Sequence, residues 1–158
     1  MATGNSVPWV HFRCRGSGQG NKRFLDGHIG TGRISLVDQT GFLGTRWDLH
    51  PGGGEGVLRV RCVGPGQGGF SLGWLDGNTV TGAVSLVKAN EAPSGTRWLI
   101  TRSHDGLLVL TCNGSQAGSF VGGRLDGNTE TGQVRLVTDE GLSGTKWGLE
   151  IPIPGTVG

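Results

Sequence analysis

The sequence contains no long apolar stretch, few charged residues and an odd number of cysteines. No segment approaches the ~18 consecutive apolar residues that a spanning helix needs, which excludes a transmembrane helix. Charged residues make up 16% of the chain and the net charge is +2, an excess too small to predict nucleic acid as a partner. Because three cysteines cannot all pair with one another, a closed disulfide framework is disfavoured.

Glycine, by contrast, is abundant. The chain has 33 glycines in 158 residues, roughly three times the average usage of about 7%. They follow no Gly-X-Y triplet, which excludes collagen, and they recur too often to leave room for helices of ordinary length. The apolar fraction of 34% is low but sufficient for one small core. The length predicts a single domain over residues 1–158.

The beginning of the sequence and its cysteine usage bear on the compartment. Residues 1–8 contain no basic start followed by an apolar run, as a secretory signal would. Together with the odd cysteine count, this favours a chain kept in a reducing compartment. We therefore expect a cytoplasmic protein, or one released without a classical signal peptide, that does not insert into membranes. Self-association into a homo-oligomer is left open.

Three copies of one unit fill nearly the whole chain. Each copy contains, in order, a cysteine, a Leu-Asp-Gly step, an alternating apolar segment and a Gly-Thr-(Arg or Lys)-Trp block. In the three copies these elements lie at 14, 25–27, 34–37 and 44–47, then at 62, 75–77, 84–87 and 95–98, then at 112, 125–127, 134–137 and 144–147. A repeat of this kind decides the fold, because each copy is one structural unit. The internal repeats are approximately 7–54, 55–104 and 105–153.

The sequence pattern predicts four short strands in each copy. Leu58, Val60 and Cys62 alternate with two arginines, the pattern of a strand with one buried face. Clusters of Gly, Asn, Asp, Ser and Pro separate the strands. The pattern predicts an all-β chain that resembles the β-trefoil, a six-stranded barrel capped by three hairpins around a pseudo-threefold axis. A β-prism is the alternative, whereas a three-bladed propeller is too narrow to close.

The repeat also resembles a known family. The string Arg23-Phe24-Leu25-Asp26, a glycine turn, Ile34-Ser35-Leu36 and a terminal Trp47 is similar to one repeat of the ricin-type trefoil lectins, and closer still to the actinohivin-like three-repeat lectins. The resemblance implies that the repeat's tryptophan is a core residue and that the aspartate of the Leu-Asp step binds sugar. These two roles fall on Trp47, Trp98 and Trp147, and on Asp26, Asp76 and Asp126.

The chain departs from that family in two ways. Gly-Thr at 44–45, 95–96 and 144–145 stands where the family has Asn-Gln, and there is no tyrosine for a sugar ring to stack on. Both departures favour an alternative function, a protein-interaction or scaffold trefoil of the fascin or inhibitor type that binds no sugar. The leading hypothesis is a non-catalytic carbohydrate-binding protein with up to three related sites, whose partners are glycans or glycoproteins.

The aspartates allow two interpretations. A carboxylate can accept hydrogen bonds from two neighbouring hydroxyl groups. An aspartate before glycine is also an ordinary turn residue that accepts bonds from backbone N–H groups one or two positions on. Further candidate ligand-binding residues are those that follow the glycine, those in the polar segment before each Leu-Asp-Gly step, and two aromatics expected to face outward beside the leucine. They are His28, Asn78 and Asn128; Gln19, Gln67 and Gln116; and Phe24 and Trp74.

Neither metal binding nor catalysis is predicted. The cysteines Cys14, Cys62 and Cys112 occupy equivalent inward positions and are expected to be small buried hydrophobes. The histidines are scattered, and no paired acid and base recur around a plausible cleft. We therefore expect no enzyme activity, no metal and no cofactor. The arginines on outward strand faces, such as Arg13 and Arg59, are expected to be solvated, with an anionic ligand such as a sulfated glycan as the alternative.

Overall fold

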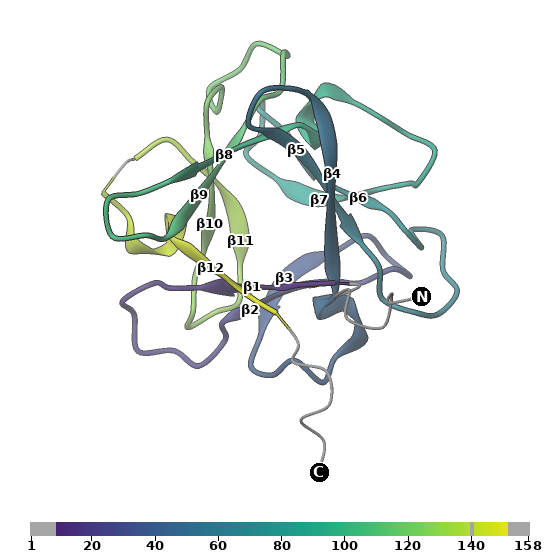
Figure 1. Ribbon diagram of the computed structural model, residues 1–158, viewed down its shortest axis with the longest axis horizontal. Helices are drawn as coiled ribbons and strands as arrows, with labels where there is room; N and C mark the ends of the chain where they lie inside the picture. The colour runs from purple at the N-terminus through teal and green to yellow at the C-terminus, as the bar shows by residue number, and fades with distance from the viewer. Residues whose placement is uncertain (1–8, 140, 152–158) are drawn as a thin grey trace, which may run out of the picture.

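The computed structural model describes residues 9–139 and 141–151. This part of the chain contains twelve strands, and a 3₁₀ turn precedes the fourth strand of each copy (Figure 1). The strands are β1 (His11–Cys14), β2 (Phe24–Gly27), β3 (Ile34–Val37), β4 (Trp47–Gly54), β5 (Val57–Cys62), β6 (Trp74–Gly77), β7 (Val84–Val87), β8 (Trp98–Arg102), β9 (Leu108–Cys112), β10 (Arg124–Gly127), β11 (Val134–Val137) and β12 (Trp147–Glu150). The 3₁₀ turns are η2 (Leu43–Thr45), η3 (Ser94–Thr96) and η4 (Ser143–Thr145). No helix among these residues is long and apolar enough to cross a membrane.

Six of the strands close into a barrel. Antiparallel pairs β1·β12, β4·β5 and β8·β9 are joined to one another by β5·β8 and β9·β12. A backbone bridge between Val10 and Trp47 completes the ring. The remaining strands form three hairpins, β2·β3, β6·β7 and β10·β11, which cap one end of the barrel. In Figure 1 the three hairpins surround the centre of the molecule. This arrangement confirms the predicted β-trefoil over the β-prism.

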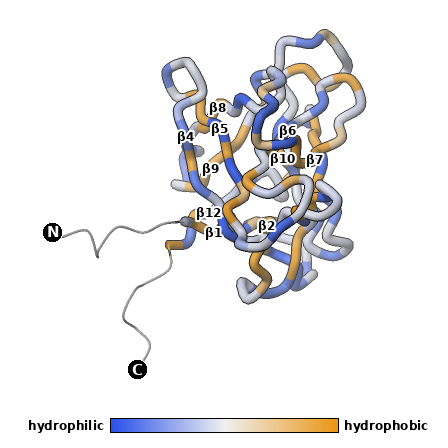
Figure 2. Tube along the Cα trace, turned by 90° about the vertical axis from the view of Figure 1, so that its right-hand side faces the viewer, coloured by the Kyte–Doolittle hydropathy of each residue, from blue (hydrophilic) through white to orange (hydrophobic). Residues whose placement is uncertain are grey.

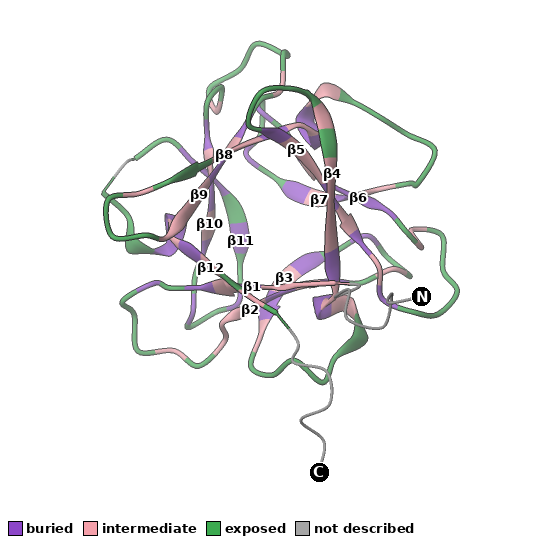
Figure 3. Ribbon diagram, in the orientation of Figure 1, coloured by how far each residue is buried: buried purple, intermediate pink, exposed green. Residues whose placement is uncertain are grey.

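The three repeat tryptophans form the centre of the core. Trp47, Trp98 and Trp147 are fully buried, as predicted. Each indole N–H donates a 3.0 Å hydrogen bond to the carbonyl of the leucine in its own Leu-Asp-Gly step. A buried tryptophan is stabilised when its one donor is satisfied in this way. Buried residues alternate with partly buried ones along most strands (Figure 3), and hydrophobic residues likewise alternate with hydrophilic ones (Figure 2).

The cysteines pack each copy against its neighbour. Cys14, Cys62 and Cys112 are buried and free, as predicted. Burial raises the pKa of each thiol, that of Cys62 to about 11, so these thiols are protonated and unreactive at neutral pH. The Cys62 thiol lies 3.8 Å from the carbonyl oxygen of Gly27 in the preceding copy, and Cys14 lies 3.6 Å from that of Gly127. The first copy therefore packs on the third, although they are far apart in sequence.

Candidate functional site

The turn that follows each Leu-Asp-Gly step is held by the residue after the glycine. Asn78 Oδ1 accepts hydrogen bonds from the backbone N–H groups of Val80 at 2.9 Å and Thr81 at 3.0 Å. Asn128 does the same in the third copy. In the first copy His28 Nδ1 accepts a bond of 3.1 Å from the N–H of Thr31. The turn role that the sequence offered to the aspartates therefore belongs to their neighbours.

The three aspartate carboxylates have no such role. Asp76 Oδ1 is buried and has no hydrogen-bond partner among the described residues. Within the same ranges no hydrogen bond or ion pair involves the carboxylate of Asp26 or Asp126. A partly buried carboxylate that lacks a partner is costly to keep. The carboxylates of Asp26 and Asp126, which line the hollows described below, are available to accept hydrogen bonds from a ligand.

Burial raises the pKa of all three carboxyl groups, but the neighbouring charges differ. In the first copy His28 opposes the effect of burial on the pKa of Asp26. In the third copy Arg135 opposes it at Asp126. In the second copy burial raises the pKa of Asp76 to about 6, and the charge of Glu91 adds to the increase. The three positions are thus equivalent in backbone and unequal in electrostatics.

The Gly-Thr dipeptide of each copy fits against the aspartate. A Cβ at Gly44 would lie 2.2 Å from the carbonyl oxygen of Gly27 and 2.6 Å from Asp26 Oδ1, and Gly95 and Gly144 are placed in the same way. The glycine is therefore required for close approach. The adjacent Thr45 is buried, and its hydroxyl donates to the carbonyl of Phe42 at 2.7 Å. Gly-Thr is thus a structural element of each copy.

Hollows open beside two of the carboxylates. The first hollow has a volume of about 200 Å³. It is lined by Asp26, His28, Ile29 and Phe42 of the first copy and by Pro65 of the second.

The other hollow, of about 180 Å³, is lined in the third copy by Asp126, Asn128, Glu130 and Ser143, and by Gly18 from the first copy. Each hollow is therefore built between two copies, because the loop after the first strand of one copy lies on the turn of the preceding copy.

The pairing also shows where the glutamine loops lie. Gln19, Gln67 and Gln116 were predicted to reach a ligand held by a nearby aspartate. Their loops contact the preceding copy: the Thr79 hydroxyl donates to the carbonyl of Gln116 at 2.6 Å, and the N–H of Phe70 donates to the carbonyl of Ile29 at 2.8 Å. Residues 16 and 18, or 64 and 65, line the hollows, while all three glutamines are exposed.

Trp74 is placed differently from the expectation that it offers an open ring face. It points away from the barrel centre, yet only 9% of it is exposed. The Arg59 guanidinium lies 3.8 Å from the ring centroid, the His50 ring meets the indole edge-on at 5.3 Å, and the indole N–H donates to the carbonyl of Ala89. A cation packed over the face of Trp74 is a structural contact, so this ring cannot serve as the predicted stacking surface.

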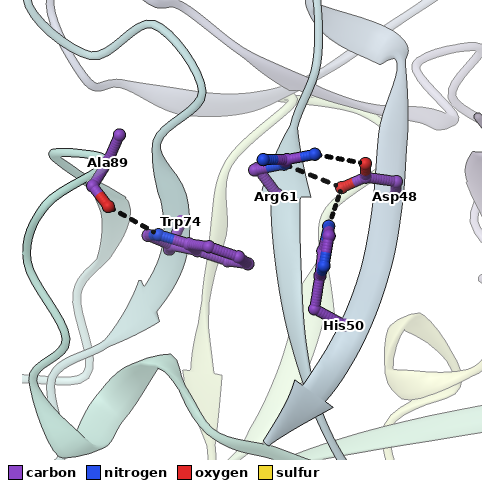
Figure 4. A network of polar contacts seen from close by, with 5 residues as sticks. All are labelled: Asp48, His50, Arg61, Trp74 and Ala89. Carbon is purple, nitrogen blue, oxygen red and sulfur yellow. Dashed lines mark hydrogen bonds and ion pairs between the residues drawn. The ribbon is translucent and has the colours of Figure 1, made fainter.

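The two arginines around Trp74 are held by different partners. Arg59 donates to the Thr96 hydroxyl at 3.2 Å and to the backbone carbonyl of Glu91 at 3.0 Å. Arg61 makes two hydrogen bonds to the carboxylate of Asp48, at 2.8 and 3.1 Å, and His50 Nε2 lies 2.9 Å from the same carboxylate. Figure 4 shows Arg61 and His50 converging on Asp48 from β5 and β4. A bidentate pair of this kind fixes the guanidinium in one orientation. These side chains form a flank cluster that belongs to the barrel wall and lines neither hollow.

Phe24 lies in a similar contact on another flank. The Arg13 guanidinium is 5.4 Å from its ring centroid, and His11 meets it edge-on at 6.4 Å. Arg13 also forms a 3.1 Å ion pair with Glu150. Phe24 is half-buried and does not line either of the two hollows.

Sequence reasoning missed Phe42. Its side chain is 47% exposed and lines the hollow beside Asp26. The equivalent positions hold Pro93 and Leu142, the latter 37% exposed and part of the hollow beside Asp126. The available signal was the repeat itself, since an apolar residue stands two positions before the glycine of every Gly-Thr block.

Comparisons with known proteins identify the fold. No family model matches the chain, and no curated sequence matches it. Among solved structures, the designed threefold-symmetric protein ThreeFoil matches with a TM-score of 0.67 and 20% identity, over 90% of this chain and 97% of its own. The BEL beta-trefoil in an apo crystal form matches with a TM-score of 0.69 and 12% identity, over 93% of this chain and 95% of its own. With the observed strand topology, these matches establish that the chain adopts the β-trefoil fold.

Proposed function

We propose that this protein is a non-catalytic carbohydrate-binding protein whose principal site is the hollow beside Asp26. The proposal is carried by one observation: in each copy a half-buried aspartate at the end of a rigid hairpin lacks any hydrogen bond from the described residues. Such a carboxylate can accept two neighbouring hydroxyl groups of one sugar ring, and charge-assisted hydrogen bonds are the stronger kind.

The side chains around Asp26 complement the two faces of a sugar. His28 Nδ1 accepts a hydrogen bond from the N–H of Thr31, which leaves Nε2 to donate to a hydroxyl or ring oxygen. The exposed ring of Phe42 offers a flat apolar surface to the C–H face of a pyranose. Phe42 thus supplies the aromatic surface for which the sequence offered no tyrosine.

The hollow beside Asp126 is a second, more polar site. Asn128 takes the place of His28, Thr129 and Glu130 take the places of Ile29 and Gly30, and Leu142 replaces the aromatic ring. A ligand with several hydroxyl or amide groups suits this lining better than one with a large apolar face. Weak sites on one rigid molecule can still bind a clustered glycan strongly, because the second binding event is intramolecular.

The test is a glycan array followed by calorimetry on the glycans that bind. We expect Asp26→Asn to weaken binding by about tenfold or more, since a hydrogen bond to a charged group contributes about 1.5–3 kcal/mol. Asp38→Asn is the matched control, because Asp38 is exposed and lies outside both hollows. If no glycan binds, or if a folded variant with all three aspartates changed to Asn binds as before, the proposal is wrong.

The interaction trefoil predicted as the alternative has one observation in its favour. Phe42 and Leu43 are adjacent, 47% and 46% exposed, and form an apolar rim. Such a rim can contact a protein as well as a sugar. Capture of one partner from a lysate, unchanged after enzymatic deglycosylation and abolished by Phe42→Ala, would favour this function over glycan binding.

A further inference from the structure

The three capping hairpins meet in a ring of six residues around the pseudo-threefold axis. Each hairpin contributes two residues around the start of its second strand, β3, β7 or β11. They stand at positions i and i+2, so their side chains point to the same side. Single backbone bridges then join each hairpin to the next. In order around the ring, the six residues are Arg33, Ser35, Gln133, Arg135, Ala83 and Ser85. We call this set the axial ring.

Backbone hydrogen bonds close the axial ring on all three sides. The N–H groups of Leu36, Leu86 and Leu136 each donate a 2.8 Å bond to a glycine carbonyl of the neighbouring hairpin. Bridged partners on facing strands lie ~5 Å apart and residues i and i+2 lie ~7 Å apart, so the ring is ~12 Å across. It is therefore small enough for long side chains on opposite sides to reach the same ligand.

All six side chains face outward. The residue between each i and i+2 pair, Ile34, Val84 or Val134, is buried in the barrel. Because side chains alternate along a strand, the ring residues point to the opposite side, away from the core. Arg33, Gln133 and Arg135 are exposed, in agreement with this geometry. The axial ring is thus a surface at the hairpin end of the barrel.

The ring carries two cations on opposite sides, Arg33 and Arg135, and the charge of Arg135 also acts on Asp126. Within residues 9–139 and 141–151, no hydrogen bond or ion pair involves the guanidinium of Arg33 or Arg135. This contrasts with Arg61 of the flank cluster, whose guanidinium is bound to the carboxylate of Asp48. Ser35 and Gln133 lie between the two arginines on one side of the ring, and Ser85 lies on the other.

Hollows meet at this ring. One of about 360 Å³ is lined by Arg135, Gln133 and Thr81, among others. Another of about 200 Å³ is lined by Arg33, Ser35 and Gln133. Both share Gln133 as a wall. The polar groups in these hollows are guanidinium, amide and hydroxyl donors.

Acids surround the ring without belonging to it. Asp126 lies opposite Arg135 in the β10·β11 pair, Asp26 opposite Ser35, and Asp76 opposite Ser85. Their carboxylates line the outer hollows described above or point toward a Gly-Thr block. Their negative charge repels an anion. A small anion near the axis, away from the three carboxylates, is therefore favoured over a large one.

We propose that the axial ring binds a tetrahedral oxyanion, a sulfate or phosphate group, between the guanidinium groups of Arg33 and Arg135. Each guanidinium donates two parallel hydrogen bonds to anion oxygens. The hydroxyls of Ser35 and Ser85 and the amide of Gln133 donate to the oxygens that remain. The site is separate from the proposed glycan site and does not depend on it.

The binding test is a titration followed by the backbone amide signals of the protein in NMR. The probes are inorganic sulfate, inorganic phosphate, and a sulfated disaccharide together with its unsulfated parent, all at constant ionic strength. We expect the free anions and the sulfated disaccharide to shift the signals of Ser35, Ser85 and Gln133, and the unsulfated parent to leave them unchanged. A response to the free anions but not to the disaccharide assigns the site to a free oxyanion. A response to neither refutes the proposal.

Two variants test the role of the arginines. Arg33→Gln combined with Arg135→Gln is expected to weaken sulfate binding by at least about tenfold. The charge-matched control is Arg15→Gln with Arg102→Gln, two exposed arginines outside the ring, which is expected to change binding by less than about twofold. Equal weakening in both pairs would show that sulfate responds only to net charge and would overturn the proposal.

A gain of binding gives a third measurement. Ala83 occupies the position equivalent to Arg33 in the repeat. Ala83→Arg adds a third cation to an exposed position of the ring, and we expect sulfate to bind several-fold more tightly. A folded Ala83→Arg protein with unchanged or weaker affinity would contradict a site at the axis, because a purely structural role for the ring predicts no gain.

Discussion

The turns of the first and second copies have the same backbone arrangement and differ in the side chains around the aspartate. In both, the glycine of the Gly-Thr block packs so closely on the aspartate that a Cβ added to it would lie 2.6 Å from the aspartate Oδ1. The first copy surrounds Asp26 with His28 and the exposed ring of Phe42, whereas the second has Pro93 in place of the ring and an acid, Glu91, near Asp76. The backbone packing is thus repeated while the side chains around the aspartate vary. Stability and ligand binding can therefore be changed by separate substitutions.

The largest expected effect concerns what the two copies share. Trp47→Ala and Trp98→Ala should each lower the free energy of unfolding by about 3–5 kcal/mol, because each leaves a large cavity and an unpaired carbonyl. Urea denaturation measures this, with Val121→Ala at an exposed position as the control, expected within about 0.5 kcal/mol of the parent. A difference of more than about 2 kcal/mol between the two tryptophan variants would contradict the equivalence of the copies.

The glycines beside the aspartates give the next largest effect. Gly44→Ala and Gly95→Ala should each cost about 1–3 kcal/mol of stability, because the new Cβ overlaps a backbone carbonyl in both copies. Thermal unfolding measures the loss. Gly69→Ala is the control, since a Cβ there meets no atom within 4 Å. Should Gly44→Ala be as stable as this control, the close contact at the aspartate would be refuted.

Asp76 should distinguish the copies through pH. Its pKa is raised to about 6 in the folded protein and is near 3.9 in the unfolded chain, so the folded state binds the extra proton between these values. The stability contributed by protonated Asp76 is present below about pH 4 and is lost as the pH rises through 6.

Asp76→Asn removes this dependence. We expect the variant to be more stable than the parent by about 1 kcal/mol at pH 7, after allowance for solvent screening, and equal to it at pH 4. Chemical denaturation across this range measures the difference. Asp38→Asn at an exposed position should show no such trend, and a gain for Asp76→Asn that is the same at pH 4 and pH 7 would exclude the raised pKa as its cause.

The smallest effect on stability should come from Phe42. Because this side chain is 47% exposed, Phe42→Ala should change the free energy of unfolding by less than about 0.5 kcal/mol. It should nonetheless weaken glycan binding at the first copy by about fivefold, through loss of the apolar stacking surface. Calorimetry measures the affinity, with Leu142→Ala as the comparison in the third copy. Unchanged affinity in Phe42→Ala would place the sugar elsewhere.

The repeat made most of the fold predictable. Alternation located the strands, and the three in-register tryptophans identified core positions that the structure confirms as fully buried. These features are local or are repeated three times, so each copy supports the assignment of the others. The burial of Cys14, Cys62 and Cys112 followed from the same alternation.

The candidate sites were predictable only in part. Alternation correctly turned Trp74 away from the core, but it gave no information on Arg59, which is distant in sequence and covers the ring. The sequence singled out the aspartates as candidates, yet the choice between a turn role and a carboxylate without partners required the positions of Asn78, Asn128 and His28. Hydrogen-bond partners depend on side-chain positions, which a one-dimensional pattern does not give.

By itself, then, the sequence determined the strands, the threefold repeat and the core. Only the tertiary structure decided which copies meet: closure of the barrel places Gly18 beside Asp126, more than a hundred residues away, and brings Arg33 and Arg135 to opposite sides of one ring. The physical reason is that alternation and turn chemistry act between neighbouring residues, whereas a closed barrel joins segments whose separation in sequence carries no signal of their contact.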